Sequence, residues 1–363
     1  MCCNTLILRM MLFENRIRFS KASCVSGEFM TNPVLVEVLR GAVVESAHRG
    51  AIAVFDADGK PVWEIGDTAR PVFPRSAVKA IQALPLVESG AADAYGFGDR
   101  ELALACASHS GEPAHVELAR AMLAKAGLDV AALECGVHWP SSHDATVALA
   151  STGNLPNALH NNCSGKHAGF LCTCVHAGVA HRGYVKSGHA SQEMVRDAMQ
   201  AVTGAAHDVD HCGTDGCSIP TYAVPLRSFA LGFARMATGA GFEPVRAKAA
   251  KRLLSACMAE PFLVAGTGRA DVALMQAASG RIFVKGGAEG VYCAALPELG
   301  LGIALKCDDG AGRAAEVTVA AVLARFLHAD KALAAILTEE ADPPIESRIG
   351  AKVGSLRPTA ALD

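Results

Sequence analysis

Two apolar runs, each interrupted by a tight turn, constrain the fold of this chain most strongly. The run GAIAVFDADGKPVWEIGD turns at residues 58–61, and the run GVYCAALPELGLGIALKCDDG turns at residues 297–298. Apolar stretches of strand length on both sides of a turn predict antiparallel β-hairpins. We therefore expect a sheet that contains antiparallel strand pairs.

Segments with helical spacing of apolar residues alternate with these hairpins. One predicted helix opens with Pro113 and stops at Gly127. The others are expected at residues 164–178, 191–203, 226–239 and 314–328. Residues 135–160 are predicted to be rich in loops. Because no repeat or linker composition divides the chain, we predict one catalytic domain over residues 30–341, of the mixed α/β (α+β) class, with an antiparallel sheet flanked by helices.

The two ends of the chain are predicted to lie outside this domain. Residues 1–29 are expected to form an unstructured extension, and Met30 is an alternative start of the protein. Residues 342–363 contain prolines and polar residues and are expected to form a polar C-terminal tail. No stretch approaches the roughly 18 apolar residues of a membrane helix, so no membrane partner is expected.

Charge and cysteine usage limit the class of partner and the compartment. Lys and Arg number 33 against 36 Asp and Glu, for a formal charge of −3, and no long run of one sign occurs. This balance argues against nucleic acid as a partner. The chain has 13 cysteines, an odd number, and no secretion signal, which together predict a reducing cytoplasm.

A serine and a lysine three residues apart, Ser76 and Lys79 in RSAVKA, are candidate catalytic residues. At helical spacing they share one face, and Pro74 before them fits a helix start. The positive end of a helix favours negative charge on the serine oxygen, and burial favours an uncharged lysine that could accept the serine proton. The alternative is that Ser76 is only a helix cap.

Two further positions extend this pair into a known order of motifs. Ser108 ends the apolar run in ACASHSGEP, where His109 is an alternative base, and Lys285 closes the β run in FVKGG. A Ser-x-x-Lys pair, a second serine and a late Lys-x-Gly follow one another in serine β-lactamases and penicillin-binding proteins. The order therefore predicts a fold of that kind, although the last motif is Lys-Gly-Gly and no Ser-Asp-Asn occurs.

The stretch NNCSGKHAGF offers candidate metal ligands. It lacks the earlier glycine and the final Ser or Thr of a phosphate loop, so we reject nucleotide binding. Cys163, with Cys217 from the loop HCGTDGCSIP, one nitrogen donor and a water, would make an open tetrahedral zinc site. Spacing alone leaves both Lys166 and His167 as the nitrogen donor, and a simple polar helix start is the alternative to a metal site.

Seven motifs, in order from about residue 34 to about residue 330, resemble the L-asparaginase II family of the Rhizobium etli type, also called class 3 asparaginases. The motifs are ESAHRG, RSAVKAIQALP, LACASHSGEPAH, CGVHWP, NNCSGKHAGFL, GTDGCSIPT and VKGGAEGVY. The resemblance implies a serine β-lactamase-like fold and a homodimer that hydrolyses L-asparagine to L-aspartate and ammonia. Residues 1–29 have no counterpart in the family, and Ala80 stands where a proline is expected.

The resemblance also implies catalytic roles. Ser76 with Lys79, and Ser108 with Lys285, correspond to the two serine–lysine pairs of the family. We expect Ser76 to attack the side-chain amide carbon after Lys79 takes its proton, and the second pair to relay protons. Backbone N–H groups, that of residue 76 among them, are expected to hold the oxyanion.

The family's cofactor is zinc, and its ligands are two cysteines and a lysine. These ligands match Cys163, Lys166 and Cys217, and the metal is expected to support substrate binding. Further positions that line the family's site match Arg75, His167 and Asp215, which are expected to bind the substrate. Arg75 is expected to meet the α-carboxylate, and Asp215 either the α-ammonium or the groups around the zinc.

Two other classes of function fit the same motifs. A glutaminase or a β-lactam hydrolase would use the same acyl transfer, because one methylene changes discrimination only about 10- to 200-fold. A non-catalytic, zinc-stabilised binding module would have to bury the serine and lysines for no chemical purpose, at a cost in free energy.

Overall fold

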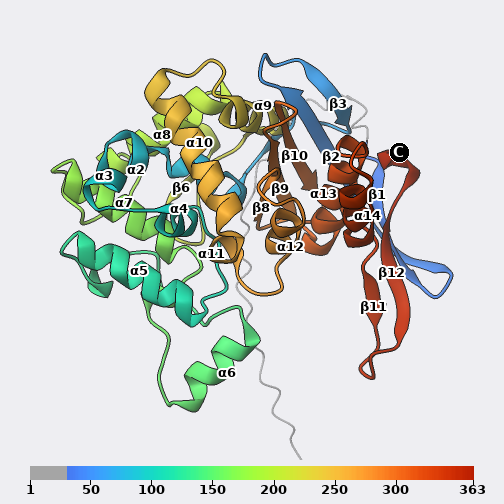
Figure 1. Cartoon of the computed structure of the whole chain (residues 1–363), viewed down its shortest axis with the longest axis horizontal. Helices are drawn as coiled ribbons and strands as arrows, with labels where there is room; N and C mark the ends of the chain where they lie inside the picture. Colours follow the sequence, from blue (N-terminus) through green and yellow to red (C-terminus); the bar gives the residue numbers. More distant parts are fainter. Residues whose placement is uncertain (1–30) are drawn as a thin grey trace, which may run out of the picture. The chain divides into compact units, whose positions relative to one another are not determined.

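Both predicted hairpins are present in the computed structural model, which describes residues 31–363 (Figure 1). Strand β2 (Val43–Asp56) pairs antiparallel with β3 (Pro61–Ile65), and β9 (Val291–Leu296) pairs antiparallel with β10 (Leu301–Cys307). The predicted mixed α/β class, with an antiparallel sheet and helices against it, is confirmed. The extension and alternative start predicted for residues 1–30 fall outside the described residues.

The main sheet has eight strands in the order β11-β12-β1-β2-β10-β9-β8, and β3 lies beside β2. All of its pairings are antiparallel. Its remaining strands are β1 (Val34–Arg40), β8 (Phe283–Gly287), β11 (Pro344–Glu346) and β12 (Lys352–Pro358). Two small sheets pair β4 (Pro71–Val72) with β7 (Val224–Pro225), and β5 (Cys212–Thr214) with β6 (Pro220–Tyr222).

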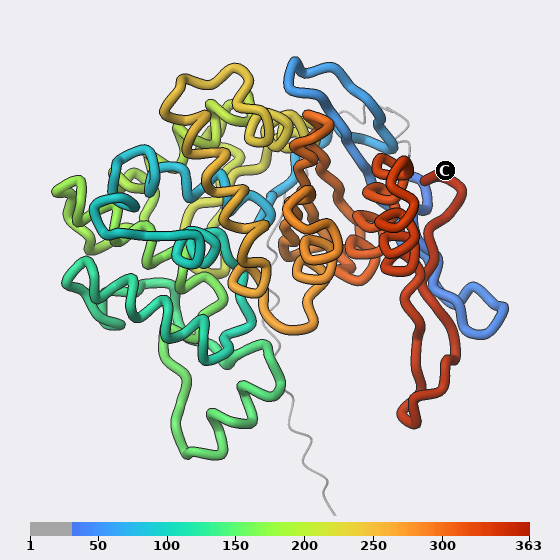
Figure 2. Tube along the Cα trace, viewed as in Figure 1, coloured from blue at the N-terminus to red at the C-terminus, as the bar shows by residue number. Residues whose placement is uncertain are grey.

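The prediction of a polar C-terminal tail over residues 342–363 is wrong. They contain β11 and β12, and β12 pairs with β1 near the start of the described chain. Figure 2 shows this pairing as a red segment beside a blue one. Inward-facing Gly354 and Leu356 alternate with more exposed residues along β12, which is the pattern of a half-buried strand. Polar composition therefore misled the prediction.

The helices predicted near residues 113–127, 164–178, 191–203, 226–239 and 314–328 are present, with shifts of a few residues at their ends, and further helices accompany them. The helices are α1 (Lys79–Gln82), α2 (Leu84–Glu88), α3 (Ala91–Ala94), α4 (Asp99–Ala105), α5 (Pro113–Lys125), α6 (His143–Ser151), α7 (Ser164–His176), α8 (Ala190–Thr203), α9 (Leu226–Thr238), α10 (Pro244–Ala259), α11 (Pro261–Ala265), α12 (Ala270–Ala277), α13 (Gly312–Phe326) and α14 (Lys331–Glu340). Helix α6 lies in the segment predicted to be loops, where Ser142 caps it by accepting a hydrogen bond from Ala145 N–H. Within residues 31–363, every helix is too short or too polar to span a bilayer.

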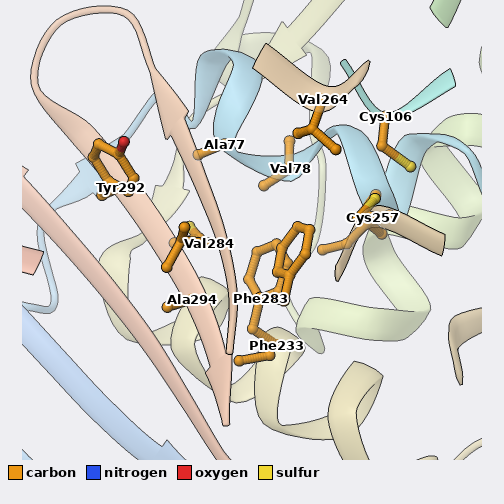
Figure 3. Close-up of a cluster of buried hydrophobic side chains, with 14 of the residues drawn as sticks. Ala77, Val78, Cys106, Phe233, Cys257, Val264, Phe283, Val284, Tyr292 and Ala294 are labelled. Atoms are coloured by element: carbon orange, nitrogen blue, oxygen red, sulfur yellow. The ribbon is translucent and has the colours of Figure 1, made fainter. Parts of the chain in front are cut away.

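Strand β8 at the edge of the sheet separates two packed layers (Figure 3). Phe283 points from β8 toward α9, where its ring stacks on Phe233 at 5.6 Å between centroids. Val284 and Tyr292 lie on the other side of β8 and β9. Because side chains alternate along a strand, Lys285 projects to the same side as Phe283. That side is also covered by the 3₁₀ helix η1 (Arg75–Val78), so the fold brings Lys285 toward Ser76.

Candidate active site

The predicted pair Ser76 and Lys79 lies where η1 passes into α1. In a 3₁₀ helix, side chains three residues apart eclipse one another, so both project to one side. The residue before the serine, Arg75, has a left-handed φ of 50°, which costs about 1–2 kcal/mol for a non-glycine residue. Ser76 is 9% exposed and Lys79 is fully buried. The local backbone therefore holds both groups in a buried turn.

Lys79 connects three segments of the candidate site. Its Nζ donates to the carbonyl oxygen of Ala107 at 2.6 Å and to Cys163 Sγ at 3.0 Å. Within residues 31–363, no hydrogen bond joins Lys79 Nζ to Ser76 Oγ. The amine thus lies between the residue preceding Ser108 and the residue preceding α7.

Ser108 accepts a hydrogen bond from Asn162 Nδ2 at 3.0 Å, and it is half-buried. The neighbouring His109 turns away from it. Gly111 N–H donates to His109 Nδ1, so Nε2 carries the ring proton and donates to Ser164 Oγ at 2.9 Å. Burial lowers the pKa of His109 well below its ordinary value, and nearby cationic groups lower it further. The geometry therefore offers Ser108 no basic partner in His109.

Lys285 is fully buried and is held by an aspartate that sequence reasoning missed. Its Nζ donates to Gly286 O at 2.8 Å and lies 3.4 Å from Asp271 Oδ1. Asp271 also accepts from Gly286 N–H at 2.8 Å and from Tyr292 Oη at 2.7 Å. Burial lowers the pKa of Lys285, Asp271 opposes this shift, and Lys79 adds to it. In the sequence, Asp271 shows only as an ordinary acidic residue in a first helical turn.

A glycine brings β8 into backbone contact with η1. A Cβ at Gly287 would lie 2.8 Å from Pro74 O, 3.0 Å from Ala77 N and 3.3 Å from Ser76 N. Only glycine permits such a close approach of two backbones. Lys285 and Ser76 therefore come from segments in direct contact.

The three predicted metal ligands lie together at the start of α7. Lys166 Nζ donates to Cys217 Sγ at 3.2 Å, and Cys163 lies close enough to Cys217 and Lys166 for both to lower its pKa. All three side chains are buried. His167, the other nitrogen donor left open by the sequence, instead bonds Tyr184 Oη through Nδ1 at 2.7 Å. The geometry favours Lys166 as the neighbour of the thiols.

Positive charges surround these thiols, and the thiols in turn raise the pKa of Lys166 against the effect of burial. The hydrogen bond with Cys217 lowers the pKa of Cys163 well below its ordinary value, against the effect of burial, and Lys79 and Lys166 lower it further. Two sulfur atoms and one nitrogen in a buried position suit zinc, provided the lysine loses its proton on binding. Within residues 31–363, no cluster of three or more His, Cys, Asp and Glu side chains could hold a metal. The set of Cys163, Lys166 and Cys217 is not such a cluster, because one of its three possible donors is a lysine.

Two of the three residues predicted to bind the substrate, Arg75 and Asp215, are hydrogen-bonded to each other. Arg75 Nε donates to Asp215 Oδ1 at 2.8 Å. Burial alone would raise the pKa of Asp215, but the charge of Lys166 and the bond from Arg75 outweigh it and lower the pKa. His167 Nε2 is buried and has no hydrogen-bond partner in the described part of the chain.

A cavity of about 270 Å³ opens beside Ser108. Its lining residues are Ser108, His109, His138, Ser141, Asn162, Arg269, Gly286, Gly287, Ala288, Tyr292, Gly312, Ala315 and Glu316. The cavity therefore joins one predicted catalytic serine to the backbone that follows Lys285. Its size suits a small molecule rather than a polymer.

Comparisons with known proteins agree with this arrangement at the level of the family. A family model described as L-asparaginase II matches residues 36–358. A beta-lactamase from Mycobacterium bovis is similar in structure, with 14% sequence identity, 76% of this chain and 94% of that chain covered, and a TM-score of 0.40. A solved protein called Mglu has 18% identity, 83% and 72% coverage, and a TM-score of 0.35. Such scores carry no argument about function. The comparison with curated proteins gives no match.

Proposed function

The chain belongs to the L-asparaginase II family, and we propose that it hydrolyses L-asparagine to L-aspartate and ammonia. The family identifies it as an amidohydrolase of small molecules, and the matched residues 36–358 include every candidate site residue. This match is the observation that carries the proposal. Two contacts between the segments that carry the predicted serines and lysines support it: Lys79 Nζ donates to the carbonyl oxygen of Ala107, next to Ser108, and Gly287, two residues after Lys285, lies against the backbone of η1.

In the proposed reaction, Ser76 Oγ forms a bond to the side-chain amide carbon of the substrate. The C–N bond then breaks, ammonia leaves with the proton that the serine gave up, and an acyl-enzyme remains. Water attacks this ester, which releases L-aspartate and restores the serine. The N–H of Ser76, next to Gly287, is one proposed donor to the oxyanion.

The lysines have separate roles in this proposal. Lys79 takes the proton of Ser76, since the two side chains project to one side of the turn. To accept this proton the amine would have to be uncharged and would have to turn away from Ala107 O, its partner at 2.6 Å. Ser108 and Lys285 relay protons to the leaving group and from the water.

Zinc is the proposed cofactor, with Cys163, Lys166 and Cys217 as its ligands. When bound there, it would supply a fixed positive charge that supports binding of the substrate. Asp215 lies close to Lys166 and would order the surroundings of the metal. Arg75, by holding Asp215, would fix the start of η1.

Ammonia release tests the proposed function. Purified protein should release ammonia from L-asparagine, with L-glutamine and a chromogenic cephalosporin as parallel substrates. Faster turnover of either alternative would favour a glutaminase or a β-lactam hydrolase on this scaffold. Release from no amide at all, with or without added zinc, would favour a binding module.

The proposal extends to a homodimer in the cytoplasm, as the family resemblance implies. Light scattering coupled to gel filtration should give a mass of about twice 37.5 kDa. A monomeric mass would contradict the dimer and would leave the proposed chemistry intact.

A further inference from the structure

Two opposite charges line the cavity beside Ser108. Of the described residues in its wall, only Arg269 and Glu316 carry a full charge at neutral pH. Arg269 immediately precedes α12, and Glu316 lies in the second turn of α13. Both side chains are half-buried. The two charges therefore reach one small space from separate elements.

Neither charge is paired at short range by another side chain of the described residues. Within residues 31–363, neither side chain forms an ion pair or a hydrogen bond, whereas Arg75 and Asp215 are joined at 2.8 Å. Burial raises the pKa of Glu316, while the charge of Arg269 opposes this shift and that of Asp271 adds to it. A half-buried carboxylate without a partner is costly, and a bound cation would relieve the cost.

The proposed substrate carries the two complementary charges. An α-amino acid amide has an α-carboxylate and an α-ammonium group on one carbon, and both must be bound if the site is to distinguish it from a simple amide. The guanidinium of arginine matches a carboxylate with two parallel hydrogen bonds, and glutamate accepts from an ammonium.

We propose that Arg269 binds the α-carboxylate and Glu316 the α-ammonium of the amino-acid substrate. This inference rests on the proposed function and names the residues that would restrict it to amino-acid amides. It differs from the expectation that Arg75 and Asp215 bind these two groups, because those side chains are paired with each other at 2.8 Å.

Truncated substrates separate the two contacts. Succinamate lacks the ammonium of L-asparagine, and 3-aminopropanamide lacks its α-carboxylate. Glu316→Gln should lower kcat/KM for L-asparagine about 10- to 100-fold, the range for one charged hydrogen bond, and should leave succinamate within about threefold. Arg269→Gln should lower kcat/KM for L-asparagine by a similar factor and should leave kcat/KM for 3-aminopropanamide within about threefold.

The larger neighbouring cavity, of about 640 Å³, supplies matched controls. Arg269 and Glu316 line it as well, but Arg313 and Glu340 line only this larger cavity. Arg313→Gln and Glu340→Gln remove the same charges and should leave kcat/KM within about twofold. Losses equal to those of the Arg269 and Glu316 variants would show a general field effect and overturn the proposal.

Calorimetry makes the test independent of turnover. On a Ser76→Ala background, L-asparagine should bind, and each of Arg269→Gln and Glu316→Gln should weaken binding by the same factor as it lowers kcat/KM. Equal binding in all variants, or no binding of L-asparagine, would overturn the proposal. If the unmodified protein hydrolysed no amide but bound L-asparagine through both residues, only the proposed reaction would fail.

Discussion

Buried lysines are the residues that demand the most explanation in this molecule. Lys79 and Lys285 have no exposed surface, and moving an ammonium group out of water costs several kcal/mol. Lys79 meets a carbonyl and a thiol, and Lys285 meets a carbonyl and a carboxylate. Of these partners only Asp271 carries a full opposite charge, and it lies 3.4 Å from Lys285 Nζ. The proposed chemical role would explain why the fold keeps both lysines.

The first prediction concerns the proposed nucleophile. Ser76→Ala should lower kcat for ammonia release by about 10³-fold or more, because the acyl-enzyme can no longer form. Its melting temperature should change little, since Ser76 Oγ has no hydrogen bond in the described structure to lose. The control is Ser151→Ala, an exposed serine on α6 that contacts only Ala148 O. A fully active Ser76→Ala protein would refute the assignment.

A second prediction concerns Asp271, the carboxylate that holds Lys285. Asp271→Asn leaves a buried ammonium without its counter-charge and should cost about 3–5 kcal/mol of stability at pH 7. The pKa of Lys285 already lies below its unfolded value of 10.5. In the pH range between the folded and the unfolded pKa of Lys285, the unfolded chain binds more protons than the folded chain, so the free energy of unfolding increases with pH. Without Asp271 the folded pKa of Lys285 falls further and this range begins at a lower pH. The loss in free energy of unfolding caused by Asp271→Asn should therefore shrink toward alkaline pH.

Denaturant unfolding of both proteins between pH 7 and pH 10 measures this deficit. Tyr292→Phe serves as the control, because it removes the hydrogen bond to Asp271 Oδ2 and retains the carboxylate charge. Its deficit should be smaller and independent of pH. A constant deficit for Asp271→Asn over the whole range would show that Lys285 does not depend on this charge.

Residue types that form motifs could be predicted from the sequence, and isolated charges could not. Ser76 and Lys79 are found by their spacing, and Cys163 by its polar neighbours. Asp271 and Glu316 look like ordinary helical acids, because only the packing of α12 and α13 against β8 and β9 brings them to the site.

At the scale of elements, the contact between β8 and η1 organises the site. β8 is an edge strand, so the N–H of Gly286 points away from the sheet and is free to bond Asp271. On the sheet face, Gly287 lies against the backbone of η1. One short strand thus fixes both Lys285 and the turn that carries Ser76.

A third prediction tests this contact. Gly287→Ala would place a methyl group 2.8 Å from Pro74 O and 3.0 Å from Ala77 N, which forces the two elements apart. Overpacking of this kind costs about 1–3 kcal/mol, and a displacement of about 1 Å at a nucleophile can lower the rate about 100-fold. Kinetics and thermal unfolding should therefore show a larger loss of kcat than of stability.

The matched control for this variant is Gly98→Ala. Gly98 is exposed, and a Cβ there would meet only Glu101 Oε2, at 3.8 Å. It should leave kcat unchanged. An active Gly287→Ala protein would mean that η1 can move without consequence for the reaction.

Elements differ in how well the sequence predicts them, and the reason is the range of their pairing. The β2–β3 and β9–β10 hairpins are local, since a turn and two apolar runs contain all the information. β12 pairs with β1, where Val36 lies opposite Pro358, and no local pattern announces a partner so distant. The polar composition of residues 342–363 therefore gave the wrong prediction.

At the scale of the whole described chain, the metal ligands come from separate regions. Cys163 and Lys166 lie at the start of α7, while Cys217 lies in the turn between β5 and β6. A zinc ion would cross-link these segments, which no disulfide joins within residues 31–363. Binding to the folded chain alone stabilises it by RT ln(1 + [L]/Kd), about 2.7 kcal/mol at a hundredfold excess over Kd.

The last prediction follows from this cross-link. Cys163→Ser removes one thiolate, so zinc content by elemental analysis should fall, KM for L-asparagine should rise, and added zinc should no longer raise the melting temperature. Cys172→Ser is the control, because this buried cysteine lies on the same helix, packs in the hydrophobic core and donates its hydrogen bond to Met122 O. It should lose stability from its changed packing and keep its zinc. Unchanged zinc content in Cys163→Ser would remove this site from the proposal, and the serine chemistry would then have to bind its substrate without a metal.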